Sequence, residues 1–228
     1  MATLTVELPS AQETMTLQDL VNRLGGIPLS RILARPAPGS ATEADLVRIN
    51  DQKERICELI DGVLVEKPMG FRESFVALAL GALLWDFVRD RKLGVVTGPD
   101  GTIRLAPGLV RLPDVALFLW ADLPGQQVPK EPIPQVVPTL VIEVLSQSNT
   151  SGEMERKRRE YFEAGVRVVW LVDPEAGTVA AFQKRMERPW EYDQRSTIEN
   201  LDFLPGFRLS VADLFASLDQ PGKSSGNA

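Results

Sequence analysis

The feature that most constrains the fold is a set of short apolar runs that flank two segments with helical spacing. The runs have the length and composition of strands. Helices are expected at 71–90 and from about Glu153 to Ala164. Strands on either side of one helix and then of a second predict an α/β fold, in which a mixed sheet is flanked by helices. The strands are expected at 56–66, 110–119, 140–145, 170–174 and 178–182.

Two Asp-Gly pairs are expected to form the turns of hairpins, Asp61-Gly62 and Asp100-Gly101. The first helix is expected to be long and largely buried, because it carries apolar residues along its whole length. Phe75, Leu78 and Trp85 are among the side chains that this pattern places in the core.

The 228 residues fit one sizeable domain with an N-terminal extension. Residues 1–50 are expected to form the extension, because a short helix at 16–24 is followed by a connector rich in proline and glycine. The extension is either laid against the main domain or loosely tethered to it. Residues 51–218 are then the main domain, and the polar residues 219–228 are expected to be a mobile tail.

The composition excludes several kinds of catalytic chemistry. The chain has no histidine, so it has no Ser-His-Asp triad, no Cys-His pair, no HExxH zinc site and no histidine base. The single cysteine, Cys57, excludes an intramolecular disulfide and a Cys-rich zinc site. Any chemistry must therefore use carboxylates, lysine, tyrosine, serine or a metal ion held by oxygen.

The location and the partners are constrained only broadly. The sequence has neither a signal-peptide pattern nor an apolar stretch of about 18 residues, so no membrane association is expected. A cytoplasmic location is expected, and the near-absence of cysteine agrees with it. The formal net charge of -6 argues against coating nucleic acid through net charge, but not against a local basic groove.

Acidic residues interrupt three of the apolar runs. They are Glu58 in ICELI, Asp114 in LPDVALFL and Glu143 in LVIEVL. An unpaired carboxylate in such surroundings costs several kcal/mol of folding free energy. Each of these acids must therefore be paired, be protonated or coordinate a cation.

Lys157 is a matching anomaly on the helix that follows Glu143. A T-x-x-E capping box at 150–153 fixes where this helix begins. Met154, Lys157 and Tyr161 then fall on one stripe that faces the core. The Lys157 ammonium group is therefore expected to point toward the strand that carries Glu143.

The same helix carries the basic run ERKRRE at 155–160. Its arginines Arg156, Arg158 and Arg159 are expected to splay toward solvent. Such a run is either a solvated helix face or, next to a candidate site, a DNA contact.

Two interpretations of the misplaced charges stay open. Carboxylates on neighbouring strands, with a lysine reaching in, suit Mg²⁺ or Mn²⁺, which prefer oxygen ligands. A metal-bound water would then attack phosphorus, with Lys157 orienting it or stabilising the developing charge. Alternatively Glu143 and Lys157 form a structural ion pair, Asp114 caps the turn after Pro113, and Glu58 faces solvent.

At these residues the chain resembles the Uma-two family, restriction endonucleases within the PD-(D/E)XK nuclease superfamily. The resemblance covers roughly 50–217, and it rests on an ordered set of segments of which each alone is weak. It implies a restriction-endonuclease-like core that cuts DNA phosphodiester bonds with a divalent metal ion. The segments are ELIDGVLVEKPMG, RLPDVALF, LVIEVLSQSNT, KRREY and AGVRVVWLVDP.

The resemblance also assigns roles to individual residues. Asp114 matches the aspartate of the family's PD motif, and Glu143 matches the acidic residue of the second strand. Lys157 matches a lysine that this branch carries on the following helix. Leu145 stands at the superfamily's usual lysine position and offers its backbone carbonyl to a metal, and Glu58 is an auxiliary ligand. The implied catalytic residues are Asp114, Glu143 and Lys157, and the implied Mg²⁺ or Mn²⁺ ligands are Asp114, Glu143, Leu145 and Glu58.

One position departs from the family, because Glu73 stands where the long helix often begins with a histidine. The departure and the acidic balance keep open a second function, an inactive nuclease-fold module that binds nucleic acid or a protein partner. Hydrolysis of RNA or a nucleotide by the same centre is a third, because no base-reading element is visible. A homodimer is expected from the resemblance alone, since members of the superfamily commonly dimerise to cut two strands.

Overall fold

The computed structural model describes residues 16–52, 55–68, 70–186, 188–216 and 218. Its centre is a six-stranded sheet of order β10-β9-β8-β7-β6-β3, beside a four-stranded sheet of order β2-β1-β5-β4 and a two-stranded sheet of β11 and β12. β7 and β8 run parallel, and the other described pairs are antiparallel. The fold is therefore the mixed α/β arrangement that the sequence predicts.

The strands of the six-stranded sheet are β3 (Gly94–Thr97), β6 (Val115–Leu119), β7 (Leu140–Val144), β8 (Val168–Asp173), β9 (Thr178–Gln183) and β10 (Trp190–Tyr192). The remaining strands are β1 (Cys57–Ile60), β2 (Val63–Glu66), β4 (Ile103–Ala106), β5 (Leu109–Arg111), β11 (Thr197–Glu199) and β12 (Arg208–Ser210). The helices are α1 (Leu17–Arg23), α2 (Glu43–Gln52), α3 (Phe71–Asp90), α4 (Ser151–Ala164) and α5 (Val211–Ala216), with 3-10 turns η1 (Leu29–Arg31), η2 (Trp120–Asp122) and η3 (Pro124–Gln126).

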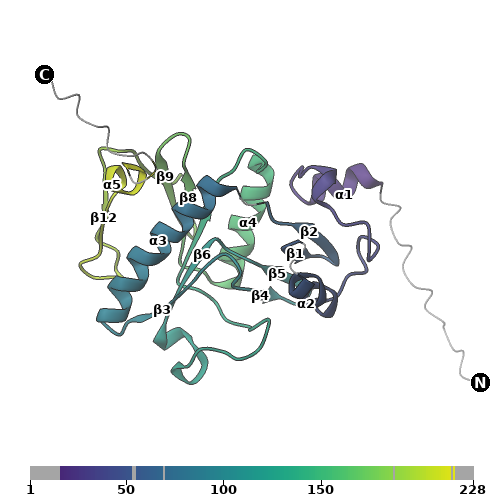
Figure 1. Cartoon of the computed structure of the whole chain (residues 1–228), viewed down its shortest axis with the longest axis horizontal. Coiled ribbons are helices and arrows are strands. Elements are labelled where there is room, and N and C mark those ends of the chain that lie inside the picture. The colour runs from purple at the N-terminus through teal and green to yellow at the C-terminus, as the bar shows by residue number, and fades with distance from the viewer. Residues whose placement is uncertain (1–15, 53–54, 69, 187, 217, 219–228) are drawn as a thin grey trace, which may run out of the picture.

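Helices α3 and α4 cover opposite faces of the six-stranded sheet (Figure 1). Side chains alternate between the two faces of a strand. Leu140 and Ile142 of β7 pack in one cluster with α3, whereas Val141 packs in another cluster with Tyr161 of α4. Glu143 falls on the same face as Val141, so the strand directs its carboxylate toward α4.

Two of the local predictions on strands and turns are confirmed. Asp61 and Gly62 have φ angles of 50° and 73°, as a tight two-residue hairpin turn requires, and they join β1 to β2. β8 pairs antiparallel with β9, in agreement with the strands expected at 170–174 and 178–182.

The predicted strand at 110–119 and the hairpin at Asp100-Gly101 are wrong. The first is two strands in different sheets, β5 and β6, because the chain bends at 112–114 around Pro113, which cannot donate to a ladder. Asp100-Gly101 does not join paired strands, since β3 pairs with β6 and β4 pairs with β5. The turn of that second hairpin lies at Gly108, where φ is 73°.

Helix α3 has the predicted bounds but not the predicted burial. Phe75, Leu78 and Trp85 are 39%, 70% and 39% exposed, while Leu80 and Leu84 are fully buried. Both sides of the helix are apolar, so the spacing of apolar residues does not define which side faces the sheet.

The described residues before 51, which the sequence analysis predicts to form an extension, are laid against the later part of the chain. Arg31 forms a bidentate ion pair with Glu153 at 2.7 and 2.9 Å, and the Thr150 hydroxyl donates to the carbonyl of Gly25 at 2.6 Å. Gly25 is required there, because a Cβ would lie 2.5 Å from the backbone nitrogen of Glu153. Residues 1–15 and the predicted mobile tail at 219–228 lie outside the described residues.

Candidate metal and catalytic centre

Four segments bring the residues implied by the resemblance to one place between the two larger sheets. Glu58 lies on β1, Asp114 directly precedes β6, Glu143 lies on β7 and Lys157 lies on α4. All four side chains are buried, with at most 5% of each residue exposed. The structure therefore gathers Asp114, Glu143, Lys157 and Glu58 into one buried centre.

Glu143 is fixed by two donors from α4. Its Oε2 accepts a hydrogen bond from Lys157 Nζ at 3.1 Å, and its Oε1 accepts one from the Tyr161 hydroxyl at 2.6 Å. Burial raises the pKa of Glu143, and the charges of Asp114 and Glu58 act in the same direction, whereas Lys157 opposes them. The carboxylates are thus close enough to repel one another.

The Lys157 ammonium group bridges Glu143 and Glu58, with a distance of 3.2 Å to Glu58 Oε1. Burial alone would lower the pKa of this lysine, but the charges of Glu143 and Glu58 outweigh burial and raise it. Lys157 therefore carries its positive charge throughout the physiological pH range.

Glu58 does not face solvent, so that alternative is wrong. It is 1% exposed, and its Oε2 pairs with Arg111 Nη1 at 2.7 Å while its Oε1 accepts from the Leu112 amide at 3.1 Å. Burial would raise the pKa of Glu58, but Lys157, Arg111 and Lys67 together lower it to about 2. Glu58 is therefore ionised and held between cations.

Asp114 contacts a residue that the sequence analysis missed, Lys67. The Lys67 Nζ lies 2.8 Å from Asp114 Oδ1 and donates to the Leu112 carbonyl at 2.6 Å. Asp114 Oδ2 accepts from the Val144 amide at 2.7 Å. Asp114 is thus tied to the strand that carries Glu143, which is more than a cap on the turn after Pro113. The signal for Lys67 was its position directly after the apolar strand of the first hairpin.

Arg111 extends the centre into a second layer of ion pairs. It is 1% exposed and pairs with Glu160 of α4 at 2.5 Å. Burial alone would lower the pKa of its guanidinium, but the charges of Glu58 and Glu160 outweigh burial and raise that pKa. Arg156 also pairs with Glu160, at 2.6 Å, and with Asp61 at 2.9 Å. The prediction that Arg156 splays toward solvent is therefore wrong.

The donor chemistry of the centre suits a hard divalent cation, but its ammonium groups now neutralise the carboxylates. Asp114 and Glu143 offer carboxylate oxygens from neighbouring strands, the ligand type that Mg²⁺ prefers. Among the described residues, no three Asp, Glu or Cys side chains cluster closely enough to form a metal-ligand group by themselves. Lys67 and Lys157 lie between the acids. The same carboxylates therefore serve as ion-pair partners in the structural interpretation and as cation ligands in the metal interpretation.

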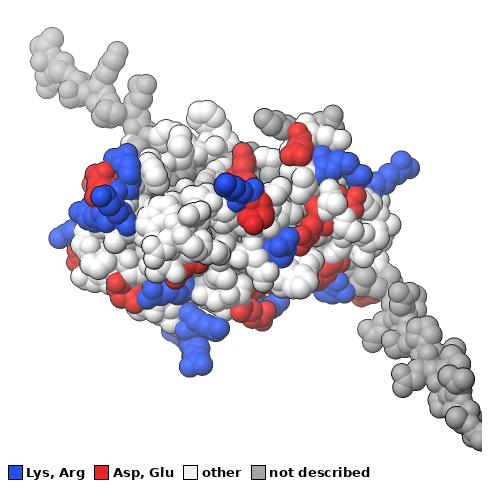
Figure 2. All heavy atoms as spheres, turned by 90° about the horizontal axis from the view of Figure 1, so that it is seen from below, with Lys and Arg blue, Asp and Glu red and all other residues white. Residues whose placement is uncertain are grey.

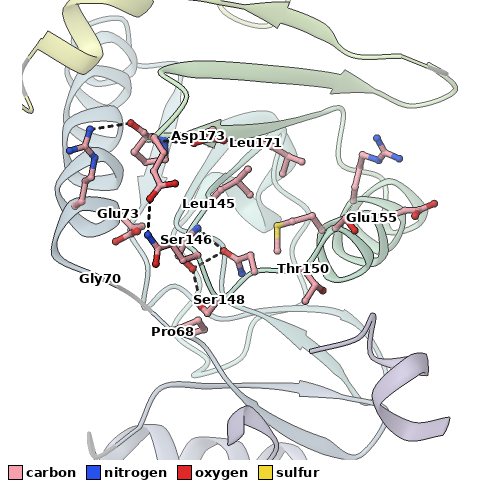
Figure 3. Close-up of a pocket in the computed structure, with 18 residues that line it drawn as sticks. Pro68, Gly70, Glu73, Leu145, Ser146, Ser148, Thr150, Glu155, Leu171 and Asp173 are labelled. Atoms are coloured by element: carbon pink, nitrogen blue, oxygen red, sulfur yellow. Dashed lines mark hydrogen bonds between the residues drawn. The ribbon is translucent and has the colours of Figure 1, made fainter. Parts of the chain in front are cut away.

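A cavity of about 850 Å³ opens beside the centre, at the carboxyl ends of the parallel strands β7 and β8 (Figure 3). Leu145, the last residue of the LVIEVL segment, lines it from the β7 side. The first turns of α3 and α4 lie on its other sides. Its charged lining residues are of both signs and comprise Arg72, Glu73, Glu155, Arg158, Asp173 and Glu175.

Two of the acidic lining residues, Glu73 and Asp173, lie against nearby backbone. Glu73 folds back over the start of α3, since a Cβ placed on Gly70 would lie 2.2 Å from Glu73 Oε2. Asp173 accepts hydrogen bonds from the amides of Glu175 and Ala176, both at 2.9 Å, so it stabilises the turn between β8 and β9.

The surface shown in Figure 2 carries positive and negative side chains in small mixed groups, with uncharged areas between them. A long positive band is typical of proteins that track a phosphate backbone. The described residues of this face provide no such band.

The chain is a mixed α/β protein whose central sheet is flanked by helices and adjoins a buried cluster of carboxylates and cations. Residues 44–212 match the family model Uma2, which is described as "Putative restriction endonuclease". The chain therefore belongs to the Uma-two family. No curated protein matches the chain.

A solved structure has the same fold. It is described as "a putative nuclease belonging to DUF820" from Anabaena variabilis. It aligns with a TM-score of 0.64 and 21% sequence identity, over 72% of this chain and 92% of that chain. None of the helices in the described part of the chain combines the length and the apolar character needed to cross a membrane.

Proposed function

We propose that the protein is a Mg²⁺-dependent endonuclease that hydrolyses DNA phosphodiester bonds at the centre formed by Asp114, Glu143 and Lys157. The observation that carries the proposal is their convergence in an apolar core, with Lys157 Nζ 3.1 Å from Glu143 and Asp114 bound to the amide that follows Glu143. Membership in a family of nuclease-like proteins supports the same reaction class.

The proposed metal ligands are the carboxylates of Asp114 and Glu143, with the Leu145 carbonyl and Glu58 as further oxygen donors. A divalent ion held there would polarise a phosphodiester oxygen and lower the pKa of a water molecule. Lys67 and Lys157 each have a flexible four-carbon stem. Their ammonium groups can therefore move aside without a change in the strands.

The other residues of the centre have supporting roles in this proposal. Lys157 stays protonated and would stabilise the negative charge that develops on the phosphoryl group. The Tyr161 hydroxyl holds Glu143 in a fixed orientation. Arg158 in the cavity lining would contact a phosphate beside the bond that is cut.

The test is cleavage of supercoiled plasmid DNA with Mg²⁺ or Mn²⁺ by the wild type, Asp114→Asn and the control variant Glu163→Gln. Glu163 is exposed on α4 and lies outside both the centre and the cavity lining. The proposal predicts cleavage that a chelator stops, a loss of at least about 100-fold in Asp114→Asn, and wild-type activity in Glu163→Gln. Equal cleavage by Asp114→Asn would overturn it.

The second candidate is a non-catalytic module that binds DNA or a protein partner. It is favoured by the ion pairs themselves, because Glu58, Asp114 and Glu143 each already have a cationic partner. It predicts no cleavage with any divalent ion. Binding of labelled DNA duplex or single strand without added metal would then be the activity to measure.

A further inference from the structure

Helix α3 has a second apolar face that the described chain leaves uncovered. Its inner face packs on the sheet through Val76, Leu80, Leu84 and Val88. We call the outer set the α3 stripe, and it consists of Phe71, Phe75, Leu78, Ala82 and Trp85. These residues are spaced by four, three, four and three positions, which is the heptad spacing of helices that pair with another helix.

The exposure of the α3 stripe is large for apolar side chains. Phe71 is 91% exposed and Leu78 is 70% exposed, while Phe75 and Trp85 are each 39% exposed. The helix runs along the outside of the six-stranded sheet (Figure 1). A helix that is apolar on both sides is normally buried on both sides, so the exposed stripe indicates a surface that binds a partner.

We propose that a second copy of this chain covers the α3 stripe, with the two α3 helices antiparallel and Leu78 on the two-fold axis. Leu78 is the middle residue of the stripe, so a two-fold axis there makes the contact between the two stripes self-complementary. Phe71 then meets the partner's Trp85, and the large Phe75 meets the small Ala82. Phe71 to Trp85 spans about 21 Å along the helix.

A neighbouring groove widens this surface. It has a volume of about 460 Å³ and lies between α3 and the segment of β12 and α5. Ala79, Ala82 and Leu83 line its α3 side. In an antiparallel pair, the flank of α3 that carries Phe75 lies over the same flank of the other copy. Phe75 of the second copy is therefore directed toward this groove.

Charged side chains beside the two α3 stripes are complementary in the same antiparallel arrangement. Asp86 lines the groove and its side chain is 66% exposed. Arg72 is exposed near the opposite end of α3, directly after Phe71, and its guanidinium also donates to the carbonyl of Pro174 at 3.1 Å. The antiparallel register brings Arg72 of one copy next to Asp86 of the other at both ends of the interface.

The chemistry of the stripe favours a protein copy over nucleic acid. Nucleic-acid affinity depends mainly on Lys and Arg contacts to phosphates, and the five stripe residues carry no charge. The first turn of α3 also borders the large cavity beside the centre. The proposed pairing would therefore hold the two cavities in a fixed relation to each other.

The test is the molar mass of the full chain, measured by sedimentation equilibrium over a range of concentrations. The wild type is expected to be a dimer, and Leu78→Glu, which places two carboxylates at the axis, should weaken the dimer by roughly 30-fold or more. Leu17→Glu is the matched control, because Leu17 is also a helical leucine and is 66% exposed. It should remain a dimer.

A second variant tests the register. Leu78→Cys should form a disulfide across the axis under mild oxidation, whereas Leu17→Cys should not. The native Cys57 is fully buried and does not compete. A monomeric wild type at all concentrations would overturn the proposal and leave the stripe to a different partner. A dimer that Leu78→Glu does not weaken would overturn the interface, and a dimer without the Leu78→Cys disulfide would overturn the register.

Discussion

Helices α3 and α4 cover opposite faces of one sheet, and they depart from the usual amphipathic pattern in opposite directions. α4 turns Lys157 and Glu160 into the core, whereas α3 turns Leu78 and Phe71 toward solvent. The chain compensates the first departure itself, because each buried charge has an ionic partner. The second departure has no compensation among the described residues. The comparison indicates that α4 is built for an internal centre and α3 for an external contact.

The largest expected effect on stability comes from removing the α4 cation that neutralises the buried acids of the centre. Lys157→Met leaves Glu143 and Glu58 without the ammonium group that they share, so the free energy of unfolding should fall by about 3–5 kcal/mol. Denaturant unfolding followed by circular dichroism measures it. Arg159→Met on the exposed side of α4 is the control, with an expected change within about 0.5 kcal/mol.

A double variant sharpens this prediction. Glu143→Gln combined with Lys157→Met removes both charges of one pair, while Arg111 still holds Glu58. The double variant should be more stable than Lys157→Met alone, because fewer unpaired buried charges remain. If the two changes were simply additive, the centre would not be a coupled ion-pair network.

The next effect compares the two faces of α3. Leu80 is fully buried and Leu78 is 70% exposed. Leu80→Ala should lower the free energy of unfolding by about 2–5 kcal/mol, through lost burial and a cavity. Leu78→Ala should change it by no more than about 0.5 kcal/mol at a protein concentration too low for association. Equal losses in both variants would mean that Leu78 packs inside the folded chain.

The pH dependence of stability should report the state of Glu58. Its folded-state pKa is lowered to about 2 from the ordinary 4.5, so its charge stabilises the fold above pH 4.5. This stabilisation is lost as the pH falls from about 4.5 toward 2, and it amounts to roughly 3 kcal/mol. The free energy of unfolding, measured at a series of pH values from 7 to 2, should therefore change less with pH for Glu58→Gln than for the wild type. The exposed Glu155→Gln should keep the wild-type slope.

The smallest effect concerns how the two helices begin. Thr150 caps α4 by accepting from the Glu153 amide at 3.1 Å, whereas the cap residue of α3, Gly70, makes no side-chain bond. Thr150→Ala should cost about 1 kcal/mol of unfolding free energy, measured by thermal denaturation. Thr150→Ser, which keeps the hydroxyl, should recover most of it. A neutral Thr150→Ala would show that Arg31 and Glu153 alone fix this end.

The sequence predicts the centre where the signal is local. Glu143 is an acid within an apolar strand, and Lys157 is a cation on an apolar stripe only 14 residues later, so the fold class and this pair follow from pattern. Lys67 is paired with Asp114, and Arg111 with Glu160, across 47 and 49 residues of chain. Contacts at such separations depend on how sheets and helices pack, which local periodicity does not encode.

The failed predictions have a similar cause. The run at 110–119 looks continuous in hydropathy, but Pro113 marks the point where the chain passes from one sheet to the other. In α3 both faces are apolar, so the pattern predicts a helix correctly and its orientation incorrectly. The exposed stripe becomes visible only once the sheet shows which side of the helix it uses.

The central claim is that the buried carboxylates form a divalent-metal site, and a calorimetric titration of Mn²⁺ tests it most directly. The wild type, Glu143→Gln and the cavity-lining control Glu155→Gln are titrated under the same conditions. The account predicts micromolar-to-millimolar binding to the wild type and to Glu155→Gln, and none to Glu143→Gln. Absent binding to all three proteins, or equal binding to all three, would contradict it.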